Sequence, residues 1–296
     1  MNLHSLLFAM AMILLVPACS SPIDERMPRP GAPILREPAG YRDVLAVGHR
    51  AALPNAELFV KSGFEAPADG VVPLFVHFQG GTKVAAENFV RMDRGGVLIA
   101  STLSGRSSAF SEPYRDRSAF AALLAAGERE LSAHCGRPLR FGAIAITFFS
   151  AGYGAVRELL KDEEWRLRID ALVSADSIYA AVVADSVRAP RLDDIEGFVR
   201  FAQSAARGEK TFVLAHGRYQ TDYAATFETA ALLRAAVAAE LQPAGTTTER
   251  GIQIANEAHQ GGFHCYEFAE ATAGIHVDLL YFVPEMVRRH VRTRER

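Results

Sequence analysis

Ser150 stands in a stretch whose residue types suit a nucleophile held on a tight turn. The residues around it, 148–154, read FFSAGYG, so small residues follow the serine directly. Before it, residues 141–149 are apolar and partly β-branched, as in a strand buried on both faces. After it, apolar residues recur at helical spacing through Leu160. We therefore expect Ser150 at a strand-to-helix turn, where its hydroxyl is exposed and faces the positive end of a helix.

This stretch resembles the nucleophile elbow of the α/β-hydrolase family, whose usual pattern is GxSxG. It departs from that pattern at the first position, where Phe148 stands in place of glycine. The resemblance implies a mostly parallel sheet with helices on both faces, a serine-histidine-acid triad and an acyl-enzyme intermediate. The alternative interpretation is a serine that caps a helix after a buried strand, as in Rossmann-like domains.

A serine hydroxyl is a weak nucleophile unless a histidine accepts its proton and a carboxylate fixes the tautomer of that histidine. In the family the order along the chain is nucleophile, acid, histidine, and the histidine lies in the loop between the last strand and the final helix. His276, in the sequence TAGIH, fits that position. His264, within a strand pattern, and His259, just before it, are the alternatives.

Two aspartates compete for the role of the acid. Asp176 ends the strand expected at residues 169–176, so its side chain should emerge at the same sheet edge as Ser150. Asp222 lies in the loop after the following strand, where the family usually keeps its acid, with Glu228 as a rival nearby. Some lipase-like members place the acid one strand earlier. We favour Asp176 and keep Asp222 as the alternative.

A glycine-containing loop follows the apolar strand expected at residues 71–78. The sequence His77-Phe78-Gln79-Gly80-Gly81 is similar to the family loop that donates one backbone N–H to the oxyanion hole. Glycine lets a backbone approach a developing negative charge without side-chain obstruction. The resemblance implies Gln79 or Gly80 as one donor and Ala151 as the second. A glycine turn that simply leaves a strand is the alternative.

Strands and helices alternate from residue 71 onward, which is typical of a mostly parallel sheet covered on both faces. The residues 106–117 form a polar stretch that we expect to be a loop, and a helix near the C-terminus is interrupted or restarts at Pro284. Further strands are expected at 57–64, 96–105, 211–216 and 263–268, and helices at 119–134, 191–207, 224–241 and 276–290.

The composition suits one folded domain and gives no reason to expect nucleic acid as a partner. The chain has 296 residues, 49% of them hydrophobic, and a formal net charge of −2. The basic stretch from Met286 is expected to be a solvated helix end. There is no HxH or HExxH spacing, so a metallohydrolase built on His259 and His264 is disfavoured, and we expect no metal or organic cofactor.

The N-terminus indicates export and a lipid anchor. The apolar run Leu6–Val16 is too short to span a bilayer unaided and is typical of a secretory signal. Val16-Pro17-Ala18-Cys19 resembles the bacterial lipobox, which implies cleavage before Cys19 and attachment of lipid to it. We therefore expect a signal peptide at 1–18, an extended tether at 19–41 and one α/β-hydrolase-like domain at 42–296. Cys135 and Cys265 either pair or stay as separate thiols.

The expected function is that of a serine hydrolase, most simply an esterase, anchored to a bacterial membrane and facing the periplasm or exterior. Ser150, His276 and Asp176 would form the triad, with Gln79, Gly80 and Ala151 around the oxyanion. Two alternatives remain: a binding lipoprotein of the same fold without catalysis, which Phe148 favours, and a serine peptidase or amidase.

Overall fold

The computed structural model describes residues 46–183 and 188–292. The expected signal peptide at 1–18, the tether at 19–41 and Cys19 lie outside the described residues. Within them the strands are β1 (Gly48–Leu53), β2 (Ala56–Lys61), β3 (Val71–Phe78), β4 (Val97–Ser101), β5 (Arg140–Phe149), β6 (Ile169–Ala175), β7 (Thr211–His216), β8 (Gln242–Thr247), β9 (Gln253–Gln260) and β10 (Phe263–Phe268). The helices are α1 (Thr82–Arg91), α2 (Ser107–Tyr114), α3 (Arg117–Cys135), α4 (Tyr153–Leu159), α5 (Glu163–Arg168), α6 (Glu196–Ala206), α7 (Thr226–Ala236) and α8 (Ala273–His290), with short 3-10 turns η2 (Ser150–Gly152) and η3 (Leu192–Asp194).

The described strands form one mixed sheet in the order β1-β2-β4-β3-β5-β6-β7-β10-β9-β8. The six central strands from β4 to β10 pair in parallel, and antiparallel strands extend the sheet at both ends. Because parallel strands place their carboxyl ends at one edge, the residues that end β3, β5, β6 and β7 lie together.

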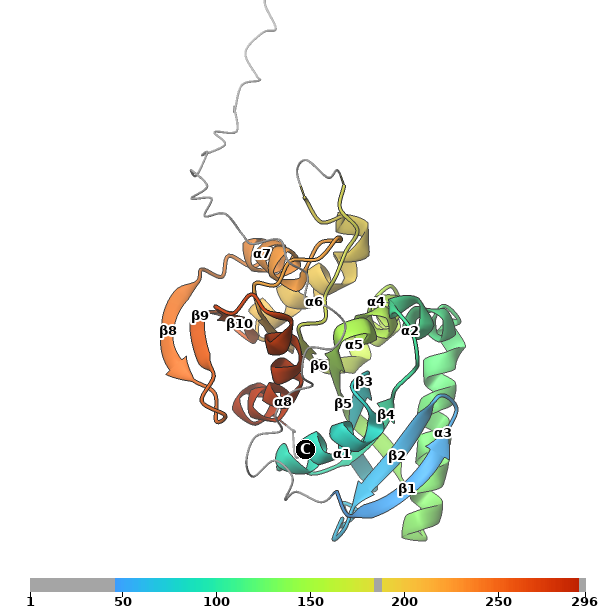
Figure 1. Ribbon diagram of the computed structural model, residues 1–296. Helices are drawn as coiled ribbons and strands as arrows, with labels where there is room; N and C mark the ends of the chain where they lie inside the picture. Colours follow the sequence, from blue (N-terminus) through green and yellow to red (C-terminus); the bar gives the residue numbers. More distant parts are fainter. Residues whose placement is uncertain (1–45, 184–187, 293–296) are drawn as a thin grey trace, which may run out of the picture. The chain divides into compact units, whose positions relative to one another are not determined.

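Helices cover both faces of the sheet, and each face has its own apolar core (Figure 1). One core receives side chains from α2 to α7 and includes Phe148 and Phe198. The other receives α1 and α8 and includes Phe149 and Leu280. Since alternate residues of a strand point to opposite faces, neighbours such as Phe148 and Phe149 are divided between the two cores. The predicted α/β architecture is confirmed.

Several predicted elements differ from those observed. Residues 107–114 of the expected polar loop form α2, and β4 ends at Ser101 rather than continuing to residue 105. The expected helix at 224–241 is shorter, at 226–236, and α1, β1, β8 and β9 were not predicted. In contrast, the bounds of β3, β7 and β10 agree with the prediction.

Helix α8 continues through Pro284, where an interruption was expected. A proline inside a helix cannot donate to the carbonyl four residues earlier, which here belongs to Leu280. The Asn88 side chain of α1 donates to that carbonyl at 2.9 Å and satisfies it. The helix therefore continues because a neighbouring helix supplies the missing donor.

The two described cysteines are separate thiols. Cys135 ends α3 and is half-buried, whereas Cys265 is buried in β10, and burial raises its thiol pKa to about 12. Among residues 46–183 and 188–292, no helix combines the length and apolarity needed to cross a bilayer.

Candidate active site

Ser150 occupies a strained turn at the carboxyl end of β5. Its φ angle is 50°, in the left-handed region that residues other than glycine rarely adopt. The Ser177 hydroxyl donates to the Ser150 carbonyl at 2.7 Å, which ties the turn to the segment after β6. Helix α4 begins at Tyr153, directly beyond the short turn η2. The predicted strand-to-helix turn is therefore observed, and the candidate nucleophile is one of seven described residues other than glycine with a positive φ.

Gly152 is required at this turn because the chain approaches β3 closely. A Cβ atom on Gly152 would lie 2.3 Å from the Phe78 carbonyl oxygen. Phe148, which replaces the first glycine of the family pattern, is fully buried, and its ring lies 6.1 Å from that of Phe198 in α6. Phe148 thus belongs to the core on the α6 face, while the adjacent Phe149 faces the opposite side of the sheet.

Asp176 and His276 form a hydrogen bond of 2.7 Å between Oδ2 and Nδ1. A carboxylate only accepts, so Nδ1–H is the donor and Nε2 is left free to accept a proton. Asp176 has a φ of 42° and is 4% exposed, and its backbone N–H donates to the Ala215 carbonyl at 2.8 Å. The end of β7 therefore holds this aspartate rigidly.

His276 lies in the first turn of α8 rather than in the loop before it, which corrects the expected position. Its side chain is 22% exposed, and its ring centroid lies 4.5 Å from that of Phe149, the residue next to Ser150. The helix thus carries the imidazole to the serine turn. Among the described residues, no hydrogen bond joins the Ser150 hydroxyl to His276.

The rival acids are engaged elsewhere or exposed. Asp222 is exposed in the loop after β7, and within the described residues it makes no hydrogen bond with a histidine. Glu228 accepts from both Nε and Nη2 of Arg188 at 3.1 Å and from the Ala225 backbone N–H at 2.8 Å. Of these three carboxylates, only that of Asp176 contacts His276.

The rival histidines belong to a separate cluster. His264 pairs with His259 across β9 and β10, and its ring stacks on His290 with centroids 3.8 Å apart. His290 bonds to the Tyr266 hydroxyl at 2.7 Å, and burial lowers its pKa to about 3. Because His264 is near the amino end of β10, this cluster lies at the sheet edge opposite to Ser150.

The loop after β3 leaves one backbone donor for an oxyanion. The N–H of Gln79 donates to the Ser101 carbonyl at 2.9 Å, so the expectation that Gln79 supplies this donor is corrected. The N–H of Gly80 makes no hydrogen bond within the described residues. Gly80 has a φ of 106°, a conformation that favours glycine, and a Cβ there would lie 2.9 Å from the end of the Leu280 side chain.

His77 is a buried residue of this site to which the sequence prediction gave no separate role. Its Nδ1 is 2.7 Å from the Thr147 hydroxyl, and burial lowers its pKa to about 4. Its Nε2 is buried without a partner and lies 3.5 Å from where a Cβ on Gly80 would stand. A neutral imidazole therefore underlies the candidate oxyanion loop.

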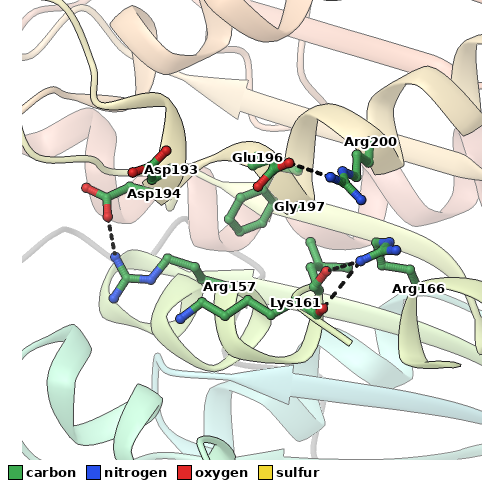
Figure 2. A pocket seen from close by; sticks show the side chains of 10 residues that line it. Arg157, Lys161, Arg166, Asp193, Asp194, Glu196, Gly197 and Arg200 are labelled. Atoms are coloured by element: carbon green, nitrogen blue, oxygen red, sulfur yellow. Dashed lines mark hydrogen bonds and ion pairs between the residues drawn. The ribbon is translucent and has the colours of Figure 1, made fainter. Parts of the chain in front are cut away.

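The cavity drawn in Figure 2 lies apart from this site, between α4, α5 and α6, and has a volume of about 160 Å³. Its cations are paired: Arg157 with Asp194 at 3.7 Å, and Arg200 with Glu196. A larger groove of about 1040 Å³ opens at the amino ends of β3 and β5. Neither cavity includes Ser150. Within the described residues, no group of three or more His, Cys, Asp or Glu side chains is placed to hold a metal ion.

The strand order, the strained serine between β5 and α4 and the Asp176–His276 pair at the carboxyl edge define an α/β-hydrolase fold. No protein-family model matches the sequence, and no curated protein matches it significantly.

Similar solved structures include an acylaminoacyl peptidase from Pyrococcus horikoshii, with 11% identity and a TM-score of 0.45 over 84% of this chain and 42% of that one. A thermostable esterase has 14% identity and a TM-score of 0.44 over 80% and 59% of the two chains. A siderophore hydrolase from Aspergillus nidulans has 13% identity and a TM-score of 0.42 over 88% and 99%. The chain thus spans about two fifths to three fifths of the first two proteins. The fold assignment rests on the strand order and turn geometry of this chain.

Proposed function

We propose that the protein is a serine hydrolase, most simply an esterase, that uses Ser150, His276 and Asp176. The observation that carries the proposal is the 2.7 Å bond between Asp176 and His276, because it leaves the imidazole Nε2 as an acceptor. The ring of His276 lies 4.5 Å from that of Phe149, which directly precedes the strained Ser150. Sequence-distant residues from the ends of β5 and β6 and the start of α8 meet there.

In the proposed reaction the Ser150 Oγ attacks the ester carbonyl carbon while its proton passes to His276 Nε2. Asp176 stabilises the imidazolium that results. The backbone N–H groups of Gly80 and Ala151 receive the oxyanion of the tetrahedral intermediate. The intermediate collapses, the alkoxide leaves with the proton from His276, and an acyl-Ser150 ester remains. Water, deprotonated by His276, hydrolyses that ester and restores the serine.

The same constellation would also cleave an amide, so a peptidase or amidase is the nearest alternative. We prefer an ester because the family that the chain resembles is richest in esterases. The non-catalytic alternative of the same fold is distinguished by the labelling experiment below, since Phe148 still departs from the family pattern although its ring packs in the core on the α6 face.

We also propose that the enzyme works in the cell envelope, anchored by lipid at Cys19. The support comes from the sequence alone: a short apolar run followed by a lipobox-like cysteine and a proline-rich tether. Radiolabelled palmitate should enter the full chain and be lost from Cys19→Ala. Equal incorporation in both would exclude this anchor.

The hydrolase proposal is tested by labelling with a fluorophosphonate, which reacts with activated serines. The folded protein should be labelled, Ser150→Ala should not, and Ser108→Ala, which changes an exposed serine of α2, should be labelled like the wild type. Failure of the folded wild type to label, or persistent labelling of Ser150→Ala, would overturn the assignment.

A further inference from the structure

Three tyrosines stand in series beside the candidate active site, and we call them the tyrosine ladder: Tyr153, Tyr179 and Tyr223. Tyr153 follows Ser150 by three residues, and Tyr179 follows Asp176 by three. The Tyr153 and Tyr179 rings are 5.5 Å apart at an angle of 71°, and the Tyr179 and Tyr223 rings are 5.1 Å apart at 84°. These are edge-to-face contacts, an arrangement that aromatic rings prefer.

The two inner rings are buried and anchored to the site itself. The Tyr179 hydroxyl donates to the Asp176 carbonyl at 2.8 Å, so this ring is fixed to the residue that holds His276. The Tyr153 hydroxyl donates to the Ser107 hydroxyl at 3.1 Å. Both hydroxyls are therefore occupied, and the two rings support the third.

The outer ring is different, because 48% of Tyr223 is exposed although its loop is firmly held. Nη2 of Arg188 donates to the carbonyls of Thr221 and Tyr223 at 2.9 and 3.1 Å, and Arg188 also pairs with Glu228. In addition, Ala224 and Ala180 exchange backbone hydrogen bonds of 2.9 and 3.2 Å. Tyr223 is therefore exposed on a loop that hydrogen bonds hold in place.

The surroundings of the tyrosine ladder decide its charge state. Burial, together with the charge of Asp176, raises the pKa of both Tyr179 and Tyr223. The phenols therefore stay uncharged at neutral pH. A cationic ligand is disfavoured at the tyrosine ladder. The Arg157 guanidinium already lies 5.5 Å from the Tyr153 ring centroid, and Arg188 donates to the Tyr223 carbonyl.

We propose that the tyrosine ladder recognises a planar aromatic group of the substrate, so that the site prefers esters that carry an aryl ring on the acyl or alcohol side. This inference rests on the proposed function. An aryl ring would continue the edge-to-face series at the open side of Tyr223, whereas an aliphatic chain would gain only buried area there.

The test compares kcat/KM for ethyl cinnamate with that for ethyl hexanoate. The proteins are the wild type, Tyr223→Ala and Tyr223→Phe, and the control is Leu167→Ala, which changes an exposed residue of α5. We expect Tyr223→Ala to lower the cinnamate-to-hexanoate ratio about tenfold, because one aromatic contact and its buried area are lost. Tyr223→Phe, which keeps the ring, should hold the ratio within about twofold. A ratio that changes in Tyr223→Ala no more than in Leu167→Ala would overturn the inference.

A binding measurement separates this inference from the proposed function. Calorimetry with ethyl cinnamate on Ser150→Ala, with and without Tyr223→Ala, should show about a tenfold weaker Kd in the double variant. If the wild type hydrolyses neither ester but this difference persists, the hydrolase proposal fails and the aromatic site stands. If hexanoate is hydrolysed but the Kd values agree, the aromatic site fails alone.

Discussion

Replacing Asp176 by asparagine tests the arrangement on which the proposed chemistry depends. The side chain is nearly isosteric, and asparagine, like aspartate, tolerates the left-handed backbone found at this position. The backbone bonds of Asp176 to Ala215 and Tyr179 do not involve the carboxylate, so the turn should persist. What changes is the partner of His276 Nδ1.

The expected loss follows from the tautomer. The carboxylate accepts from Nδ1–H at 2.7 Å, whereas an asparagine amide can donate to Nδ1 and so place the imidazole proton on Nε2. An Nε2 that carries a proton cannot accept one from Ser150, and the charge that stabilises the imidazolium is gone. We expect kcat to fall about 10³- to 10⁴-fold, which corresponds to about 4 to 5.5 kcal/mol of transition-state stabilisation.

The assay is steady-state hydrolysis of an activated short-chain ester by the wild type, Asp176→Asn and Asp222→Asn. Asp222 is the matched control, because it lies exposed in the loop after the next strand. Its variant should retain kcat within about twofold, as do most surface changes that break no buried contact. Circular dichroism of each variant reports whether the fold persists. A fall in kcat for Asp222→Asn equal to that for Asp176→Asn, or retention of activity by folded Asp176→Asn, would refute the reasoning.

Three further outcomes are expected from the same region. Gly152→Ala should lower the free energy of unfolding in urea by about 2 kcal/mol or more, because its Cβ would meet the Phe78 carbonyl at 2.3 Å; unchanged stability would contradict the close approach. Ser150→Gly should be about 1 kcal/mol more stable to urea than Ser150→Ala, since glycine relieves the strain of a φ of 50°, and a reversed order would argue against that strain. His77 has a pKa of about 4 in the folded protein against 6.5 unfolded, so it binds fewer protons when folded. Its contribution to the free energy of unfolding is therefore fully present above pH 6.5 and falls by about 3 kcal/mol towards pH 4. In urea titrations this pH dependence should flatten in His77→Gln, and an equal slope would exclude His77 as its source.

Elements with sharp changes of polarity were predictable from the sequence. The strands β3, β7 and β10 begin and end where an apolar run meets turn residues, and their predicted bounds agree with those observed. In contrast, β8 reads QPAGTT and is almost wholly exposed, so no hydrophobic pattern marks it. The pairing of β8 with β9 depends on tertiary contacts, which the local sequence does not reveal.

The sequence yields candidate residues for the site but not their arrangement in space. Ser150 and Asp176 both end apolar strands, which the periodicity reveals. The choice between Asp176 and Asp222 depends on which carboxylate reaches His276, and that distance is set by how α8 packs across the sheet. Likewise, only the register of β3 and β4 reveals that the Gln79 N–H is already bonded to Ser101.

In the proposed triad the acid follows β6, which has a consequence for how this scaffold can diversify. Because the proposed acid, Asp176, follows β6, the connection from β7 to α7 carries no residue of the proposed triad. Exchanges at its exposed positions 218, 220 and 222 can then alter this surface without displacing the proposed triad, whereas Tyr223 and Ala224 are held against Tyr179 and Ala180. Directed evolution of new selectivity should accordingly accept mutations at those exposed positions more readily than at Asp176 or Tyr179, because Asp176 bonds to His276 and Tyr179 bonds to the Asp176 carbonyl.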